Sequence, residues 1–209
     1  MGLIVYCGLL TTLSAFSTDI VLPAFQSMTE DLNAPIIWVQ GTVPVFSASF
    51  AVAHMVLGPA SDRFGRRSII AVGLVICLIG IVVAALGETV TQVLIGRAIQ
   101  GFGCAAGPVL ARAMLRDTHS GERLAHAMAI TMAIFAIGPL TAPLLGFFLT
   151  EAFGWRAVFV AMATLTLSLM ALSFLWLQET LPEERRQKLN LAKLIRSSAE
   201  IFGHSQSRY

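Results

Sequence analysis

Six long apolar stretches dominate this chain of 209 residues and restrict what it can fold into. A helix needs about 20 mostly apolar residues to cross the hydrocarbon core of a bilayer. Backbone N–H and C=O groups must bond to one another within lipid, so each stretch is expected to be a helix. Charged residues make up only 12% of the sequence, about half the share usual in soluble domains. The sequence therefore predicts an all-α membrane protein with a six-helix transmembrane domain over residues 1–178. The predicted spans are 3–24, 36–57, 68–87, 91–112, 125–149 and 156–177.

Lysine and arginine alternate between the two sides of these spans. The connections 25–35, 88–90 and 150–156 hold a single basic residue, Arg156. The connections 58–67 and 112–124 hold three arginines each, and the residues after 177 hold six basic residues. Because positively charged connections stay on the cytoplasmic side of a membrane, both termini are expected to be cytoplasmic.

The segment 179–209 departs from the pattern of the spans. It starts with Pro182 and a run of charge, and apolar residues then recur at near-helical spacing between 191 and 202. This segment is expected to be a cytoplasmic linker that contains either a short amphipathic helix on the membrane surface or disordered chain.

Several classes of function are disfavoured by the composition. A net charge of only +2 offers no basic face for nucleic acid. The cysteines Cys7, Cys77 and Cys104 are odd in number and lie far apart within apolar runs, which favours core packing over a disulfide framework or zinc site. The sequence shows no catalytic triad, metal-ligand cluster or phosphate-binding loop, so no enzyme activity, cofactor or metal is expected. His54 and His126 lie near the ends of spans and are assigned no role.

Two charged residues lie inside predicted spans. An aspartate at the centre of a spanning helix costs about 2.5–3.5 kcal/mol on insertion scales, so Asp19 is a candidate functional residue. Its alternative role is that of a residue at the outer interface. Arg97 lies at a similar depth in another span, and we hypothesise that Asp19 and Arg97 share one polar layer facing a central cavity. Protonation of Asp19 would then couple proton entry to export; a purely structural ion pair is the alternative.

A short sequence echo suggests an internal repeat. F-G-R-R at 64–67 follows the second span, and F-G-W-R at 153–156 follows the fifth. The two copies lie on opposite sides of the membrane, at matching positions of successive three-helix units. The sequence therefore predicts two inverted three-helix repeats, an arrangement found in many transporters.

Four motifs in sequence order resemble those of the major facilitator superfamily, and in particular its Bcr/CflA drug:proton antiporters. G-P-A-S-D-R-F-G-R-R resembles the G-x-x-x-D-R-x-G-R-R signature between the second and third helices. The stretches S-T-D-I-V-L-P-A-F and G-P-L-T-A-P-L-L-G resemble the first-helix and fifth-helix motifs. R-A-I-Q-G-F-G-C-A-A-G, followed by A-R-A-M-L-R-D, resembles the fourth-helix motif. The motifs span Gly58–Arg67, Ser17–Phe25, Gly138–Gly146, Arg97–Gly107 and Ala111–Asp117.

The resemblance implies the amino-terminal six-helix domain of a twelve-helix transporter whose second six-helix domain is absent from this sequence. Its expected function is proton-coupled efflux of a lipophilic or cationic drug by alternating access in the bacterial inner membrane. The missing carboxy-terminal half, or a second copy of the chain, would complete the cavity. The fifth-helix stretch departs from the family pattern G-P-x-x-G-G, which leaves the coupling mode open. A transporter of a metabolite or sugar, and a truncated half that transports nothing, are the alternatives.

The resemblance also assigns roles to residues. Asp62 is expected to latch this half to the other half, while Arg66 and Arg67 either join that gate or simply anchor the turn at the anionic inner surface. From the residues themselves, Gly58 and Gly65 are expected to allow a tight turn. The gating motif comprises Gly58, Asp62, Arg63, Gly65, Arg66 and Arg67; the neighbouring charge network Arg112 and Asp117; the proton or substrate site Asp19, Arg97 and Gln100; and the helix-bending motif Pro139, Pro143 and Gly146.

Overall fold

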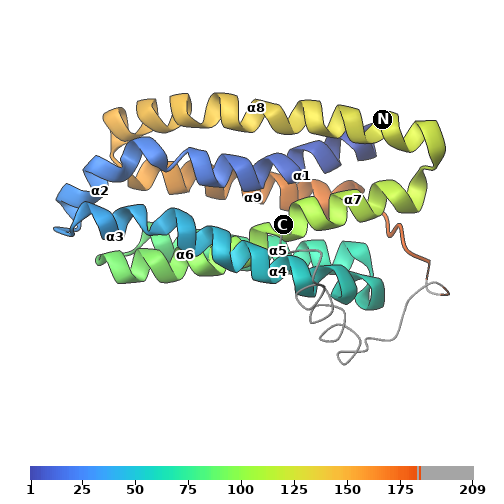
Figure 1. The fold of residues 1–209 in the computed structure, drawn as a ribbon, viewed down its shortest axis with the longest axis horizontal. Coiled ribbons are helices and arrows are strands. Elements are labelled where there is room, and N and C mark those ends of the chain that lie inside the picture. Colours follow the sequence, from blue (N-terminus) through green and yellow to red (C-terminus); the bar gives the residue numbers. More distant parts are fainter. Residues whose placement is uncertain (183, 185–209) are drawn as a thin grey trace, which may run out of the picture.

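The computed structural model describes residues 1–182 and 184, which form an all-helical bundle (Figure 1). Six of its continuous or nearly continuous helical segments are long and apolar enough to cross a membrane. The prediction of six spanning helices is confirmed. The elements are α1 (Gly2–Asp19), η1 (Leu22–Ala24), α2 (Phe25–Asp31), α3 (Ile36–Gln40), α4 (Thr42–Phe64), α5 (Arg66–Ala85), α6 (Val90–Cys104), α7 (Ala106–Thr118), α8 (Gly121–Phe153) and α9 (Arg156–Trp176).

Most helices run past the ends of the predicted spans. The connection expected at 58–67 is helical from Gly58 to Phe64, so the chain turns at Gly65 alone. The connection expected at 112–124 shrinks to two residues, His119 and Ser120. The difference arises because hydropathy marks only the apolar part of a helix. Backbone hydrogen bonds from residue i to i−4 form equally well in the polar turns beyond it.

Two glycines make the sharpest turns and share one conformation. Gly65 has φ 92° and ψ 152°, and Gly154 has φ 80° and ψ 169°. Positive φ at such ψ is open to glycine and costly for other residues, so both positions require the absence of a Cβ. Each glycine follows a phenylalanine; Gly65 directly precedes α5, and Gly154 is separated from α9 by Trp155 alone. The repeated F-G pair in the sequence therefore marks two turns with similar backbone conformation.

Gly58 does not share that role. It lies inside α4, and a Cβ at this position would meet only one atom, Val109 Cγ1, at 4.0 Å. The expectation that Gly58 shapes the turn is wrong, because the chain turns at Gly65, about two helical turns later.

Glycines also set the closest helix packing. A Cβ on Gly80 of α5 would come within 2.6 Å of Gln100 Cα, and a Cβ on Gly103 of α6 within 2.8 Å of Cys77 Cα. A Cβ on Gly107 would collide with the carbonyl oxygen of Leu10 in α1. Gly103 and Gly107 are four residues apart, and their close packing joins the α6–α7 segment to both α5 and α1.

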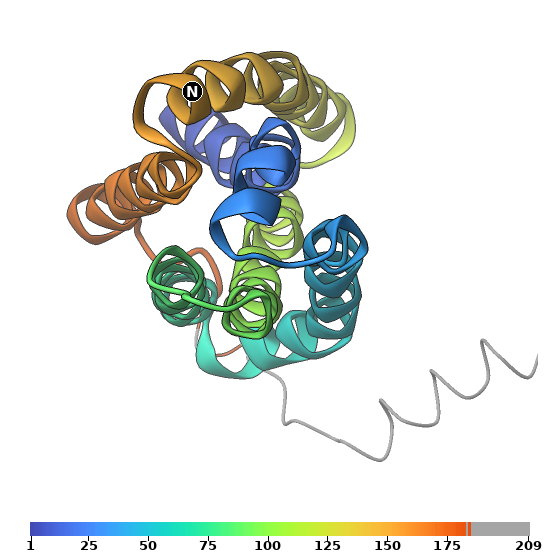
Figure 2. The same ribbon diagram turned by 90° about the vertical axis from the view of Figure 1, so that its left-hand side faces the viewer.

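The α6–α7 segment connects the two sides of the bundle. α6 packs on α4 and α5, whereas α7 packs mainly on α1. In the end-on view of Figure 2, α7 lies near the centre, with α8 and α1 on one side and α4 and α5 on the other. α6 starts at a capping box, in which the Thr89 side chain accepts from the backbone N–H of Gln92 and the Gln92 side chain accepts from that of Thr89.

Candidate functional site

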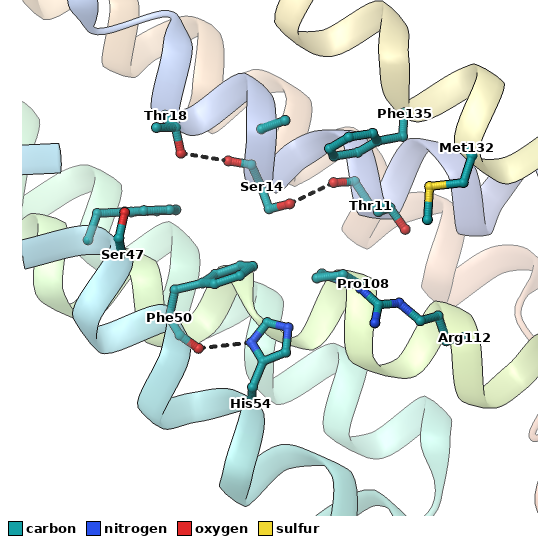
Figure 3. Close-up of a pocket in the computed structure, with 12 residues that line it drawn as sticks. Thr11, Ser14, Thr18, Ser47, Phe50, His54, Pro108, Arg112, Met132 and Phe135 are labelled. Carbon is teal, nitrogen blue, oxygen red and sulfur yellow. Dashed lines mark hydrogen bonds between the residues drawn. The ribbon is translucent and has the colours of Figure 1, made fainter. Parts of the chain in front are cut away.

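A cavity of about 300 Å³ lies between α1, α4, α7 and α8 (Figure 3). Aromatic and other apolar groups make most of its wall, and a few hydroxyl and basic side chains converge on it, which is the composition of a small-molecule site. Its lining residues are Thr11, Ser14, Ala15, Thr18, Phe46, Ser47, Phe50, His54, Pro108, Arg112, Met132 and Phe135.

The hydroxyl groups of α1 in this wall are held by their own helix. Thr11 Oγ1 donates to the carbonyl of Cys7 at 2.8 Å, and Thr18 Oγ1 donates to the carbonyl of Ser14 at 3.1 Å. A hydroxyl that donates its proton in this way keeps lone pairs that can accept a hydrogen bond from a ligand. The α1 side of the cavity therefore offers mainly acceptors.

Arg97 and Gln100 lie directly behind the cavity wall. Arg97 is fully buried, and its Nη1 donates to the carbonyl of Ser17 at 3.0 Å and to Gln100 Oε1 at 2.8 Å. Its guanidinium group lies 4.4 Å from the centre of the Phe46 ring, and that ring forms part of the cavity wall. Gln100 Nε2 in turn donates to the sulfur of Met162, so the pair links α6 to α1, α4 and α9.

Asp19 is half-buried at the end of α1 and does not bind Arg97. Neither residue forms an ion pair with another residue that the structure describes. Arg97 instead binds the backbone two positions earlier, at Ser17. Residues two apart on a helix point roughly 200° away from each other, so similar depth in the membrane did not bring the two charges together. The hypothesised ion pair is absent, and neither residue lines the cavity.

A charge cluster ties four segments together at the Gly65 end of the bundle. Arg66 is buried, and its guanidinium group contacts Asp62 Oδ1 at 2.7 Å and Asp117 Oδ2 at 3.0 Å. The carboxylate of Glu179 accepts the backbone N–H groups of Arg66 and Arg67 at 2.9 and 3.2 Å, where it caps the start of α5. We call Asp62, Arg66, Asp117 and Glu179 the Gly65-end cluster.

The remaining arginines of the expected gating motif and charge network lie outside this cluster. Arg63 is exposed beside the Phe64 ring, and exposed Arg67 donates to the carbonyl of Phe174 at 3.1 Å. Arg112 belongs to the cavity wall rather than to the network with Asp117. A helix of 3.6 residues per turn places these two positions, five apart, on different faces of α7.

A second cluster lies at the opposite, Gly154 end. Asp31 Oδ2 accepts from Trp155 Nε1 at 2.9 Å and from Arg156 Nη1 at 2.5 Å. Arg156 Nη2 also donates to the carbonyl of Gly87 at 3.1 Å. These contacts join the end of α2, the α5–α6 connection and the start of α9, and we call Asp31, Trp155 and Arg156 the Gly154-end cluster.

The proline motif lies in a helix that continues without a break. α8 runs from Gly121 to Phe153 with Pro139 and Pro143 inside it. Gly146 packs closely on α1, since a Cβ there would collide with the carbonyl oxygen of Ile20. The structure thus gives Gly146 a packing role against α1.

Sequence reasoning missed Glu179, Asp31 and the place of His54 in the cavity. Glu179 had been assigned to a linker, and Asp31 only to a loop poor in basic residues. Their partners lie 113 and 125 positions away in the chain, a separation that leaves no local pattern. His54 could have been found from its spacing, since Phe46, Phe50 and His54 recur every four residues and so share one face of α4.

Six membrane-length helical segments, four of which line a cavity, with a charge cluster at each end, define a multi-pass membrane domain of the transporter type. Residues 7–204 match the model of the Major Facilitator Superfamily, and the chain belongs to that family. Members of this family are transporters and not enzymes.

The chain is similar to named bacterial resistance proteins. It is 30% identical over 205 residues to "Multidrug resistance protein D" of Escherichia coli (strain K12). This match covers 98% of this chain and 51% of the relative. It is 33% identical over 190 residues to "Bicyclomycin resistance protein homolog" of Haemophilus influenzae, covering 91% of this chain and 48% of the relative. The chain therefore spans about half the length of these relatives.

The fold matches half of a solved transporter. The crystal structure of the peptide transporter POT in complex with alafosfalin superposes with a TM-score of 0.75 at 13% identity, covering 95% of this chain and 43% of that one. The described helices thus correspond in fold to one half of a major facilitator transporter.

Proposed function

We propose that this chain is the amino-terminal half of a proton-coupled exporter of small organic compounds in a bacterial inner membrane. The cavity between α1, α4, α7 and α8 is the observation that carries the proposal, because it is concave, largely apolar and lined by convergent polar groups. The names of the relatives, which are resistance proteins, favour export of drugs over uptake of nutrients. The distribution of lysine and arginine supports a cytoplasmic location for both termini.

The cavity needs a second wall. A carboxy-terminal half, or a second copy of this chain, would supply it, and substrate would be exposed alternately to the two sides by rocking of the halves. In this scheme Asp62, which is 41% exposed, exchanges its contact with Arg66 for a contact with the opposite half. α8 contains the proline motif and packs on α1, so the two helices would move together as one wall of the cavity.

Asp19 is the proposed proton carrier. It is an acid at the end of α1, without an ion-pair partner among the described residues, so its charge is free to change during a transport cycle. Arg97 and Gln100 hold the backbone of α1 two residues earlier, and a change at Asp19 would reach them through that turn.

The first test is the size of the native gene product. An intact mass near twice 22.4 kDa supports an ordinary twelve-helix exporter. A product of 22.4 kDa requires a cross-linked dimer that transports; a monomer without transport would contradict the proposal.

The second test measures export itself. The complete gene is expressed in a bacterial strain lacking its own drug exporters, and retained norfloxacin fluorescence is followed with and without an uncoupler. We expect lower retention that the uncoupler restores, and loss of export in Asp19→Asn. Asp31→Asn is the matched control, since Asp31 is also an acid at the end of a helix but already has an ion-pair partner, Arg156. Export that ignores the proton gradient, or an equal effect of both variants, would refute proton coupling through Asp19.

A further inference from the structure

The charged side chains that line the cavity are all basic. Among the described lining residues, His54 and Arg112 are the ones that can carry charge, and none is an aspartate or glutamate. Figure 3 shows the two side chains extending from α4 and α7 toward the same part of the cavity. Arg112 forms no hydrogen bond or ion pair with a residue that the structure describes, so its guanidinium donors remain open to a ligand.

A third positive charge lies behind the wall. Arg97 is fully buried against the Phe46 ring, and its Nε and Nη2 groups have no hydrogen-bond partner among the described residues. A buried charge without a counter-ion is costly, and its field extends into the neighbouring cavity. Asp19 neither lines the cavity nor pairs with Arg97, so this positive charge has no ion-pair partner among the described residues.

His54 adds a polar group of known orientation. Its Nδ1 lies 2.9 Å from the carbonyl oxygen of Phe50, so Nδ1 must carry the proton that this oxygen accepts. The other ring nitrogen, Nε2, is then free to accept a hydrogen bond, or to donate one when the ring is protonated. The centre of the Phe50 ring lies 4.5 Å from that of the imidazole, with the two rings tilted by 52°, and Phe50 continues the aromatic wall.

We propose that the cavity prefers amphipathic organic anions, namely aromatic carboxylic or sulfonic acids. The acid group would bind the planar donor fork of Arg112 beside His54, an arrangement suited to carboxylate and sulfonate oxygens. The aromatic body would lie against Phe46, Phe50 and Phe135. This inference rests on the proposed function, and it replaces the expectation of a cationic drug with the opposite charge.

A matched series of probes tests the preference. The full-length protein that contains this chain is purified in detergent, and equilibrium dialysis measures binding of 2-naphthoate, 2-naphthamide and 2-naphthylmethylammonium. These probes share one ring system and differ in charge. A charge-assisted hydrogen bond in a partly buried site changes affinity by about tenfold or more, so naphthoate should bind at least about tenfold more tightly than the amide. The ammonium probe should bind most weakly.

Variants locate the effect. Arg112→Gln should weaken naphthoate binding about tenfold and amide binding less than about twofold. Arg112→Lys keeps the charge and should retain part of the preference. Arg123→Gln is the control, because Arg123 is also an exposed arginine but lies outside this cavity. Thermal unfolding of each variant confirms that it is folded, as expected for an exposed side chain.

The inference is overturned by tighter binding of the ammonium probe, by no binding of naphthoate, or by equal effects of Arg112→Gln and Arg123→Gln. Its failure is distinct from failure of the proposed function. Proton-driven export of norfloxacin without naphthoate binding would overturn the anion preference alone. Naphthoate binding that depends on Arg112 without proton-driven export would support the preference and overturn proton-coupled efflux.

Discussion

Two adjacent arginines, Arg66 and Arg67, should differ sharply in their contribution to stability. The sequence gives them the same role, but the structure does not. The Arg66 side chain is only 8% exposed and contacts both Asp62 and Asp117. Arg67 is exposed and donates to one backbone carbonyl, that of Phe174. The substitutions Arg66→Gln and Arg67→Gln therefore form a matched pair with the same chemical change.

The expected size of each effect follows from the exposure of the partners. The Asp62 carboxylate is 41% exposed, so its pair with Arg66 is worth about 0.2–1 kcal/mol, as for surface ion pairs. The Asp117 carboxylate is 19% exposed, and the loss of its charged partner costs about 1.5–3 kcal/mol. Arg66→Gln should thus lower the free energy of unfolding by about 2–4 kcal/mol. Arg67→Gln should lower it by less than about 1 kcal/mol.

Thermal unfolding in detergent measures the difference. A chain of this size loses about 2–4 °C in Tm per kcal/mol, so Arg66→Gln should lower Tm by roughly 4–16 °C and Arg67→Gln by less than about 4 °C. A thiol-reactive dye reports the transition, because Cys7, Cys77 and Cys104 are buried in the folded chain. Equal shifts for the two variants, or a larger shift for Arg67→Gln, would refute the reasoning from burial.

Three further experiments test other parts of the fold by the same thermal assay. Gly80→Ala should cost about 1–3 kcal/mol, because its Cβ would come within 2.6 Å of the α6 backbone, whereas Gly58→Ala should be neutral or raise stability by up to about 1 kcal/mol. Equal costs would contradict the packing argument. Glu179→Gln removes the charge that caps α5 and should cost about 0.3–2 kcal/mol, while an unchanged Tm would exclude a stabilising cap. A double-mutant cycle of Asp31→Asn and Arg156→Gln should give a coupling energy below about 1 kcal/mol that falls with added salt, since both side chains are nearly half exposed. A coupling above about 2 kcal/mol would show that water does not screen this pair.

The fold was predictable because each spanning helix carries its own signal. An apolar run such as 68–87 is long enough to identify a span without knowledge of its neighbours. Helix ends carry no such signal when they are polar, which is why Gly58–Phe64 was expected to be a loop and is a helix. The turn at Gly65 could be predicted, but only its φ shows that this glycine, rather than Gly58, reverses the chain.

The site was less predictable because it depends on the direction in which each side chain points around its helix axis. Asp19 and Arg97 were matched by depth along the membrane, yet Arg97 faces Ser17. Glu179 could not be assigned for a different reason. Its partner Arg66 is distant in the sequence, and the two meet only because the helices between them pack together. Sequence identifies which charges are unusual, whereas tertiary packing decides which of them meet.

The two contacts of Arg66 suggest how one cluster can both hold a half together and serve as a gate. Asp117 lies in the same half and is largely buried, so we expect its contact to persist in every state of the transporter. Asp62 is more exposed and weakly held, so exchanging Arg66 for a partner in the opposite half would cost about 1 kcal/mol or less. Asp62→Asn should therefore lower Tm by less than about 4 °C while reducing export by the full-length protein more than about tenfold, because only the conformational equilibrium depends on that exchange. A large loss of stability together with the loss of export would show instead that Asp62 is structural, and unchanged export would remove it from the gate.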